Sequence, residues 1–184
     1  MKKLSALIIA KADSGRLKNK NTLPFNGEPM FLTNVKKCLK IFDKVYVSSE
    51  NEDILDWADS RGAITIKRPK ELCGLTPNIP VYKHAVQFMG DIDGIIAVQA
   101  NSPTIHPLII KKVKHAMEFC EEVITVHPNG KIYGSVWGIE RKRLLAYEDF
   151  YNPKPVIKIE DTSIDIHEEK DYYEALDQNQ YDEH

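Results

Sequence analysis

Hydrophobic residues follow two alternating patterns along the first two thirds of the chain. Short apolar runs rich in branched side chains predict buried strands at 4–10, 44–49, 63–67, 94–99 and 122–126. Between these runs, apolar residues three or four positions apart predict helices at 29–42, 52–61, 81–89 and 107–120. Pro29 and Pro107 suit first helical turns, Asn51 suits a helix N-cap, and Gly62 suits a helix end.

The pattern changes after residue 126. Alternating positions predict a strand at 131–139, and a short helix is expected at 141–147. A strand near 156–159 then leads through 163–166 to a last helix that begins near Glu168. The segment 68–80 holds three prolines and one glycine, which predicts a loop. We therefore expect a single domain over residues 1–176, followed by a polar tail at 177–184.

The alternation of strands and helices predicts the fold class. It favours an α/β fold, a three-layer α/β/α sandwich around a mixed sheet that is mostly parallel. In such sheets, ligands bind across the carboxyl ends of the strands where the strand order reverses. Four segments are expected at that edge: the loop from Lys11, the loop from Arg68, the turn after Gln99 and the turn around Asp165.

Composition limits the partners of the protein. The 184 residues include 25 Lys and Arg against 27 Asp and Glu, so the net charge of -2 favours neither nucleic acid nor an anionic membrane. No apolar run approaches the roughly 20 residues of a membrane span, and the N-terminus lacks a signal-peptide core. The three cysteines have no C-x-x-C spacing and are expected to be reduced, so we expect a cytoplasmic protein.

The loop after the first strand gathers positive charges and small residues. The cations are Lys11, Arg16, Lys18 and Lys20, the one acid is Asp13, and the small residues are Ala12, Ser14 and Gly15. Cations and backbone amides at the end of a first parallel strand are typical of polyphosphate sites, although a solvated basic loop is an alternative. The glycine spacing fits neither a P-loop nor a G-x-G-x-x-G dinucleotide site.

This loop also resembles the opening of a known enzyme family. The chain reads I-I-A-K-A-D-S-G-R-L-K-N-K-N at 8–21 and L-P-F-N-G-E-P at 23–29. Further segments match in order: D-K-V-Y-V-S-S-E-N-E at 43–52, R-P-K-E-L at 68–72, V-Q-A-N-S-P at 98–103, G-S-V-W at 134–137 and I-D-I-H at 164–167. Together they resemble the acylneuraminate cytidylyltransferases, or CMP-sialic acid synthetases, and their octulosonate relatives. The resemblance implies a Rossmann-like nucleotidyltransferase fold.

The resemblance also implies a reaction and a set of site residues. A hydroxyl of an acidic sugar, a surface-glycan precursor, would attack the α-phosphate of CTP and release pyrophosphate, with Mg²⁺ as cofactor. The catalytic residues would be Lys11 and Lys20. The nucleotide would be bound by Ala10, Lys11, Ser14, Arg16, Lys20, Asn21, Arg68, Asn78 and Gln99, with Arg68 and Asn78 near the base and Gln99 near the ribose. The metal would be bound by Asp165 and His167.

Several of these residues have a structural alternative. Arg68 could form a surface ion pair, and Gln99 could bond only to a neighbouring loop. Asp165 could cap the helix that begins near Glu168, and His167 could be a free surface histidine.

The chain also departs from the family pattern. Lys11 stands where the family has an arginine, and a lysine cannot form the bidentate hydrogen bonds of an arginine to a phosphate. Ala12 and Asp13 stand where the family has two glycines. His167 replaces a second aspartate, and Mg²⁺ prefers oxygen ligands. Either another acid supplies the missing oxygen, or Mn²⁺ is used, or the metal site is weak; the candidate acids are Glu160, Asp161 and Glu168.

These departures leave three questions open. Only about thirty residues separate Val126 from Val156, so the arm that reaches a partner subunit in the family is trimmed here and a homodimer stays an open alternative. A nucleotidyltransferase of the same fold with another nucleotide or a non-sugar acceptor is a second interpretation. A nucleotide-binding homologue with weakened catalysis is a third.

Overall fold

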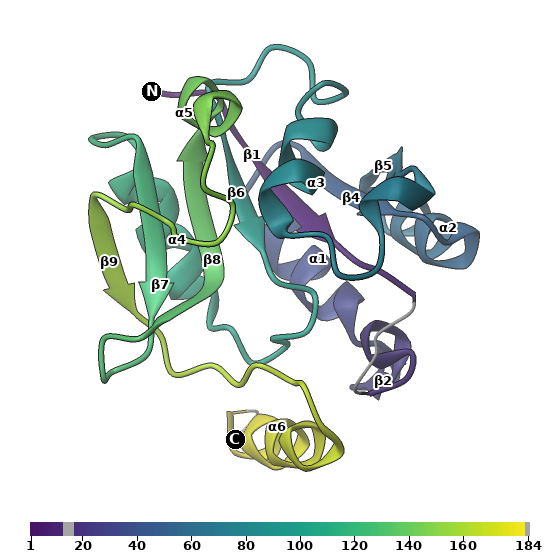
Figure 1. The fold of residues 1–184 in the computed structure, drawn as a ribbon. Helices are drawn as coiled ribbons and strands as arrows, with labels where there is room; N and C mark the ends of the chain where they lie inside the picture. The colour runs from purple at the N-terminus through teal and green to yellow at the C-terminus, as the bar shows by residue number, and fades with distance from the viewer. Residues whose placement is uncertain (13–16, 183–184) are drawn as a thin grey trace.

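A seven-stranded sheet forms the centre of the protein (Figure 1). The computed structural model describes residues 1–12 and 17–182. The strands lie in the order β5-β4-β1-β6-β8-β7-β9. Their bounds are β1 Leu4–Ile9, β4 Val45–Ser49, β5 Ile64–Lys67, β6 Gly94–Val98, β7 Glu122–Val126, β8 Ile132–Glu140 and β9 Ile157–Glu160. Strand β8 is antiparallel to both of its neighbours, and the other pairs are parallel.

Helices cover both faces of this sheet. The helices are α1 Phe31–Leu39, α2 Glu52–Ser60, α3 Asn78–Ala85, α4 Pro107–Ala116, α5 Arg141–Ala146 and α6 Glu169–Asp182. Side chains of α1, α2 and α4 share one buried cluster with the sheet, and those of α3 and α5 share the cluster on the opposite face. In β1, Ala6 and Ile8 enter the first cluster and Leu7 the second. The predicted three-layer α/β class and mostly parallel sheet are confirmed.

The strand order reverses beside β1. From β1, the sheet grows through β4 and β5 on one side and through β6 on the other. The segments that follow the carboxyl ends of the neighbouring strands β1 and β6 lie side by side at this point, and residues of both line one crevice. This crevice lies at the edge where the four predicted segments were expected.

Three elements differ from the sequence prediction. Pro29 is not in a helix: it belongs to a hairpin of β2 Pro24–Phe25 and β3 Glu28–Pro29, turned by Asn26 and Gly27 with φ of 52° and 77°. Helix α3 begins at Asn78, within the predicted loop, because Pro80 occupies a first-turn position where no helical N–H bond is required. Short 3-10 turns η1 Lys20–Thr22 and η2 Lys70–Leu72 were not predicted.

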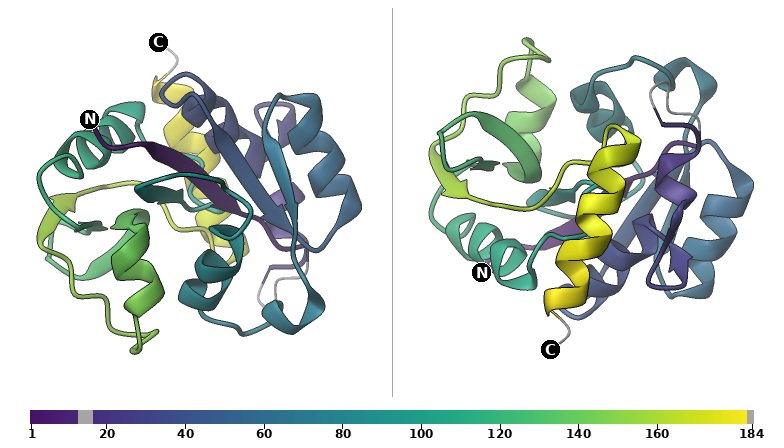
Figure 2. Two further views of the ribbon diagram at one scale, coloured as in Figure 1. Left: turned by 90° about the horizontal axis from the view of Figure 1, so that it is seen from above. Right: turned by 90° about the horizontal axis from the view of Figure 1, so that it is seen from below.

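The last helix stands apart from the sheet. Figure 2 shows α6 lying beside the chain near the β2–β3 hairpin, and residues of both share a small cluster that includes Phe25, Met30, Ile166 and Ala175. The helix continues to Asp182, through most of the segment expected as a tail. Within the described ranges, no helix has the length and apolar character needed to cross a membrane.

A buried asparagine fixes the turn after β6. Asn34 of α1 is fully buried, and its Nδ2 donates to the carbonyl oxygens of Gln99 at 2.8 Å and Ser102 at 2.9 Å. The Ser102 carbonyl also accepts from the amide of Ile105 at 3.2 Å, and the amide of Gln99 donates to the carbonyl of Ser135 at 2.8 Å, so Asn34 and these backbone bonds together position Gln99.

Replacement of Asn34 by alanine should therefore destabilise the protein. The carbonyl of Gln99 would lose its donor on Asn34, and the buried carbonyl of Ser102 would keep only the amide of Ile105, so we expect Asn34→Ala to lower the free energy of unfolding by about 1–3 kcal/mol. Urea titration would measure the loss. Lys112→Ala, at an exposed position of α4, is the control and should change that free energy by less than about 0.5 kcal/mol. Equal stability of Asn34→Ala and wild type would contradict this role.

Candidate nucleotide site

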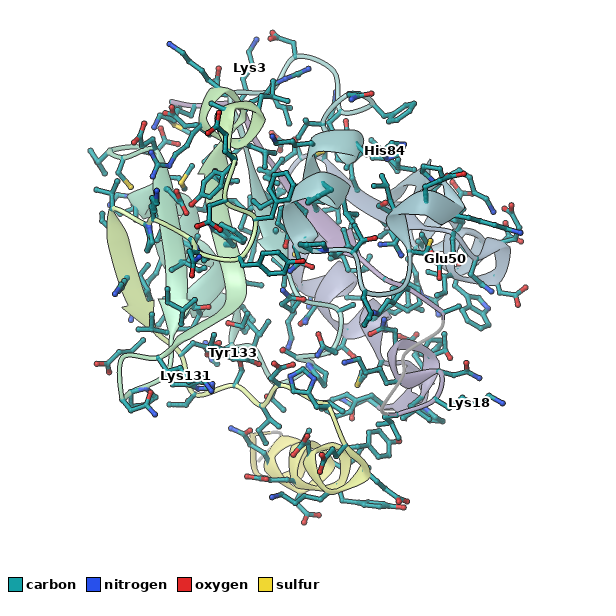
Figure 3. The ribbon with its side chains drawn as sticks, viewed as in Figure 1. Lys3, Lys18, Glu50, His84, Lys131 and Tyr133 are labelled. Atoms are coloured by element: carbon teal, nitrogen blue, oxygen red, sulfur yellow. The ribbon has the colours of Figure 1, made fainter. Side chains whose placement is uncertain are left out.

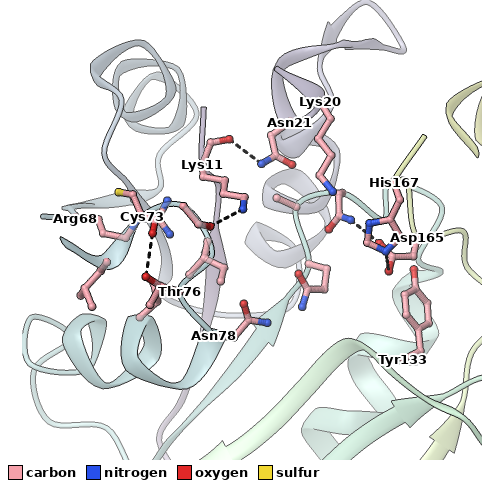
Figure 4. A pocket seen from close by; sticks show the side chains of 17 residues that line it. Lys11, Lys20, Asn21, Arg68, Cys73, Thr76, Asn78, Tyr133, Asp165 and His167 are labelled. Atoms are coloured by element: carbon pink, nitrogen blue, oxygen red, sulfur yellow. Dashed lines mark hydrogen bonds and ion pairs between the residues drawn. The ribbon is translucent and has the colours of Figure 1, made fainter. Parts of the chain in front are cut away.

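A pocket opens at the crevice between the β1 and β6 loops (Figure 4). We call it the switch-point pocket. Eight residues predicted from the sequence line it: Lys11, Lys20, Asn21, Arg68, Asn78, Gln99, Asp165 and His167. Ala10 is fully buried beneath it, where its amide donates to Ser48 at 3.0 Å. Ser14 and Arg16, also predicted, lie outside the described residues.

Side-chain bonds hold the two ends of the β1 loop together. Asn21 donates from Nδ2 to the carbonyl oxygen of Lys11 at 2.9 Å. Lys11 Nζ in turn donates to the carbonyl oxygen of Gly74 at 2.9 Å, across the pocket mouth. Asn21 is only 4% exposed, and its Oδ1 has no hydrogen-bond partner in the described structure. A buried acceptor at a pocket wall suits a ligand N–H or O–H group, because an unpaired buried oxygen is costly.

A buried ion pair supports the other side of this loop. The Arg68 side chain is 3% exposed, and its NH2 lies 2.5 Å from Glu50 Oε2. Glu50 Oε1 accepts from the amide of Ala12 at 2.9 Å, so one carboxylate joins the start of the loop to Arg68. Arg68 therefore forms an ion pair, as the structural alternative for this residue proposed, but its side chain is buried and does not lie on the surface. Its Nε has no hydrogen-bond partner in the described structure.

The carboxylate form of Glu50 is favoured in the folded protein. Partial burial alone would raise the pKa of Glu50, but hydrogen bonds from Arg68 and from the backbone amides of Glu50 and Ala12 outweigh it and lower that pKa. The residue lies at the edge of α2 and β5, visible in Figure 3. Sequence reasoning did not single it out, although it lies in the S-S-E-N-E segment that matched the family pattern.

The opposite wall of the pocket carries the acidic residue. Asp165 Oδ2 lies 2.7 Å from His167 Nε2, and Asp165 Oδ1 accepts from Asn101 Nδ2. The backbones of Asn101 and Ile166 also bond, with the Ile166 amide donating to the Asn101 carbonyl at 3.0 Å. Lys20 Nζ donates to the carbonyl oxygen of Ile166 at 3.0 Å. The segment 165–167 is therefore attached both to the turn after β6 and to the β1 loop.

The structural alternatives for Asp165 and His167 are not realised. Asp171 caps the start of α6 instead, since its Oδ2 accepts from the amides of His167 and Glu168 at 2.9 Å each. Burial opposes ionisation of Asp171, but these two amides lower its pKa overall. His167 is paired with Asp165 rather than free. Asp161, a candidate third acid, is buried outside the pocket and accepts from Ser135 and Ser163.

Asp165 and His167 are the donors in the pocket that could hold a metal. The described residues contain no cluster of three or more His, Cys, Asp or Glu side chains arranged as metal ligands. Mg²⁺ is nonetheless commonly held by one or two carboxylates together with substrate phosphates and water, so Asp165 fits such an ion. The imidazole nitrogen of His167 is a poorer ligand for Mg²⁺, which prefers oxygen.

A tyrosine borders the acidic wall. The hydroxyl of Tyr133 lies 2.6 Å from Ser102 Oγ, and its ring stacks on His127 at 4.5 Å between centroids. Burial, followed by the negative charge of Asp165, raises the pKa of Tyr133. The phenol therefore stays neutral and can donate a hydrogen bond at this end of the pocket.

Comparison with known proteins identifies the family. The sequence profile described as Cytidylyltransferase matches residues 5–146, more than half of the chain. The chain belongs to the cytidylyltransferase family. The family predicted from the sequence is thereby confirmed. The matched region includes the predicted residues from Ala10 to Gln99, whereas Asp165 and His167 lie beyond it.

Individual cytidylyltransferases are distant in sequence. N-acylneuraminate cytidylyltransferase of Escherichia coli O18:K1:H7 is 25% identical over 166 residues, which cover 85% of this chain but only 40% of that protein. CMP:2-keto-3-deoxy-manno-octonic acid synthetase complexed with CTP has a TM-score of 0.79 at 14% identity, covering 98% of this chain and 99% of the other. At that identity the likeness concerns the fold.

A second similar structure contains a metal. Rv0371c of Mycobacterium tuberculosis H37Rv in complex with manganese has a TM-score of 0.72 at 13% identity, covering 95% of this chain and 98% of that one. This likeness, too, is one of fold.

The Glu50–Arg68 pair yields a test of stability and of its pH dependence. Glu50→Gln would leave a buried guanidinium without a counter-charge, so we expect the free energy of unfolding to fall by about 1–3 kcal/mol at pH 7. Because folding lowers the pKa of Glu50 below 4.5, this contribution is present above that pH and is lost as the pH falls through the lowered native value. Urea midpoints between pH 7 and pH 3 would measure it.

The control is Glu71→Gln, whose side chain is exposed in η2 near the same pocket. It should shift the free energy of unfolding by less than about 0.5 kcal/mol. A difference between wild type and Glu50→Gln that stays constant down to pH 3 would contradict the proposed linkage.

Proposed function

We propose that the protein transfers CMP from CTP to a hydroxyl group of an acidic sugar and releases pyrophosphate. The observation that carries this proposal is the arrangement of the switch-point pocket, where Lys11 and Lys20 of the β1 loop meet Gln99 and Asp165 in one cavity. Membership of the cytidylyltransferase family supports CTP as the nucleotide. The acidic acceptor rests on the similarity to a relative named N-acylneuraminate cytidylyltransferase.

The lysines would hold the triphosphate. An ammonium group has three N–H donors, so the bond from Lys11 to the Gly74 carbonyl orients this side chain and leaves capacity for phosphate oxygens. Lys20 is oriented by the Ile166 carbonyl on the opposite side of the loop. The two cations, from the two ends of the β1 loop, would neutralise the charge that develops on the departing pyrophosphate.

The base and ribose would lie between α3 and the turn after β6. Arg68 and Asn78 line that side of the pocket, and Gln99 lies in the turn that Asn34 fixes. The unpaired Oδ1 of Asn21 and Nε of Arg68 offer one buried acceptor and one buried donor to the nucleotide. Polar groups already held in place lose little entropy on binding, which favours a specific nucleotide.

The reaction is a displacement at phosphorus. The acceptor oxygen forms a bond to the α-phosphorus, the bond from that phosphorus to the pyrophosphate oxygen breaks, and the hydroxyl proton passes to water. The protein contributes mainly position and positive charge. A divalent ion, Mg²⁺ or Mn²⁺, would be held by Asp165 and His167 and would supply further positive charge to the phosphate oxygens.

Nucleotide choice can be tested by thermal stability. CTP with Mg²⁺ or Mn²⁺ should raise the melting temperature more than UTP, GTP or ATP at the same concentration, because only a ligand that binds the native state stabilises it. A larger shift with another nucleotide would favour the second interpretation, a nucleotidyltransferase of different specificity. A shift with CTP but no pyrophosphate release with any sugar acid would favour a homologue with weakened catalysis.

The role of Lys20 can be separated from the general effect of positive charge in the β1 loop. Lys20→Ala should lower the rate of CTP-dependent pyrophosphate release by about 100-fold or more, since it removes one charge from the transition state. Lys18→Ala is the matched control, because Lys18 is exposed in the same loop and does not line the pocket. Its rate should stay within about twofold of wild type. An unchanged rate in Lys20→Ala would remove this residue from the mechanism.

A further inference from the structure

A groove opens at the amino ends of the strands, at the end of the sheet opposite to the switch-point pocket. It has a volume of about 700 Å³, and its apolar lining comes from Met1 before β1, Ile41 after α1 and Phe119 after α4. Phe119 is 77% exposed. An aromatic ring exposed to water beside an apolar groove marks a surface suited to contact with another molecule. We call it the basic groove because of the charges around it.

Positive charges surround the basic groove. The lysines that line it are Lys40, Lys111 and Lys114. The acid among its described lining residues is Glu118, which accepts from the amide of Lys2 at 2.9 Å. The side chains of Lys40 and Lys111 are exposed and form no hydrogen bond or ion pair with the described part of the chain. The groove therefore suits an apolar side chain that is flanked by acids.

Helix α6, at the opposite end of the molecule, carries the complementary surface (Figure 1). Its inner side packs on the β2–β3 hairpin through Ala175. On its outer side, Tyr173 is 57% exposed, and the acids around it are Glu169, Glu174 and Asp177. These three acids are exposed and form no ion pair with the residues that the structure describes. The helix thus presents an aromatic ring surrounded by negative charge.

The two surfaces also match in length. Helix α4 and the turn that continues it present a stripe at intervals of four residues, made of Lys111, His115 and Phe119. Helix α6 presents a stripe with the same intervals, made of Glu169, Tyr173 and Asp177. At the rise of an α-helix, each stripe is about 12 Å long. The outer face of α6 can therefore lie along the groove with its acids near the lysines.

The fold determines which copy of the chain could supply this helix. The basic groove lies at the amino ends of β1, β4 and β7, whereas α6 follows the segment 165–167 at the pocket, so the two cannot meet within one chain. Two grooves that faced each other would place lysines against lysines, which is unfavourable. The remaining pairing joins the groove of one copy to α6 of the next.

We propose that the basic groove binds helix α6 of a second copy of this chain, with Tyr173 beside Phe119 and the acids of α6 facing the lysines of the groove. The contact joins two different surfaces, so each pair of copies keeps one free groove and one free α6, and further copies add head to tail. One helix face buries little area, which makes the association weak and reversible. This contact is independent of the reaction in the switch-point pocket.

Sedimentation velocity at increasing protein concentration tests the contact. The sedimentation coefficient of the wild type should rise with concentration and fall back in about 1 M NaCl, which screens charges more than about 3 Å apart. Reversal of the groove charges, in Lys40→Glu/Lys111→Glu, should raise the dissociation constant by about tenfold or more. Reversal of the helix charges, in Glu169→Lys/Asp177→Lys, should do the same.

Two controls accompany these variants. Lys44→Glu/Lys112→Glu reverses the same number of charges at exposed positions that do not line the groove, and it should associate as the wild type does. An equimolar mixture of the groove variant and the helix variant places opposite charges face to face at both contacts. The mixture should therefore associate, whereas each variant alone stays monomeric. Equal urea midpoints show that all variants remain folded.

Three outcomes would overturn the proposal. The first is a wild type that stays monomeric at every concentration. The second is association that is lost in the groove variant but kept in the helix variant, because another acidic surface would then occupy the groove. The third is a monomeric protein that binds vesicles of phosphatidylserine and phosphatidylcholine through Lys40 and Lys111, because the groove would then serve a membrane surface.

Discussion

The burial of β1 on both faces is the constraint on which the other features depend. Ala6, Leu7 and Ile8 are all inaccessible to solvent, so helices must cover the sheet on each side of this strand. Parallel strands can pair on both edges of β1 only if the chain crosses over in both directions, which reverses the strand order beside it. The crevice between the β1 and β6 loops follows from this packing, and the pocket occupies that crevice.

Within the crevice, opposite charges are kept on separate walls. Glu50 is neutralised by Arg68 behind the β1 loop, whereas Asp165 is directed to Asn101 and His167 on the far wall. Lys11 and Lys20, which lie between them, each donate to a backbone carbonyl oxygen, that of Gly74 and that of Ile166 respectively. A carbonyl oxygen carries no net charge, so these two bonds orient the ammonium groups without an opposite charge of their own.

Much of this arrangement could be predicted from local patterns of apolar and capping residues in the sequence. The apolar runs predicted the strands within one or two residues, and Asn51 caps α2 as predicted, accepting from the Ile54 amide at 3.0 Å. The residues grouped at strand ends meet in one pocket because carboxyl ends of parallel strands share an edge. The hairpin was missed although Asn26 and Gly27 are a strong turn signal, because Pro29 has a φ that suits a helix start equally well.

The partners of the site residues could not be predicted in the same way. Glu50 contacts Arg68, and Asn101 contacts Asp165, across 18 and 64 positions of sequence, so no local period indicates these pairs. The capping role considered as an alternative for Asp165 belongs to Asp171, because the chain turns into α6 only after the 165–167 segment has bonded to the turn after β6. Such choices depend on tertiary packing, which a short sequence window does not contain.

The attachment of residues 165–167 has a consequence for biosynthesis. These residues follow all seven strands in the chain, yet they supply the acidic wall and hold Lys20. Domains generally fold as units during synthesis. The cavity therefore gains its acidic wall only after nearly the whole of this unit has been synthesised and residues 165–167 have docked on the β6 turn, beside the hairpin that packs against Ile166.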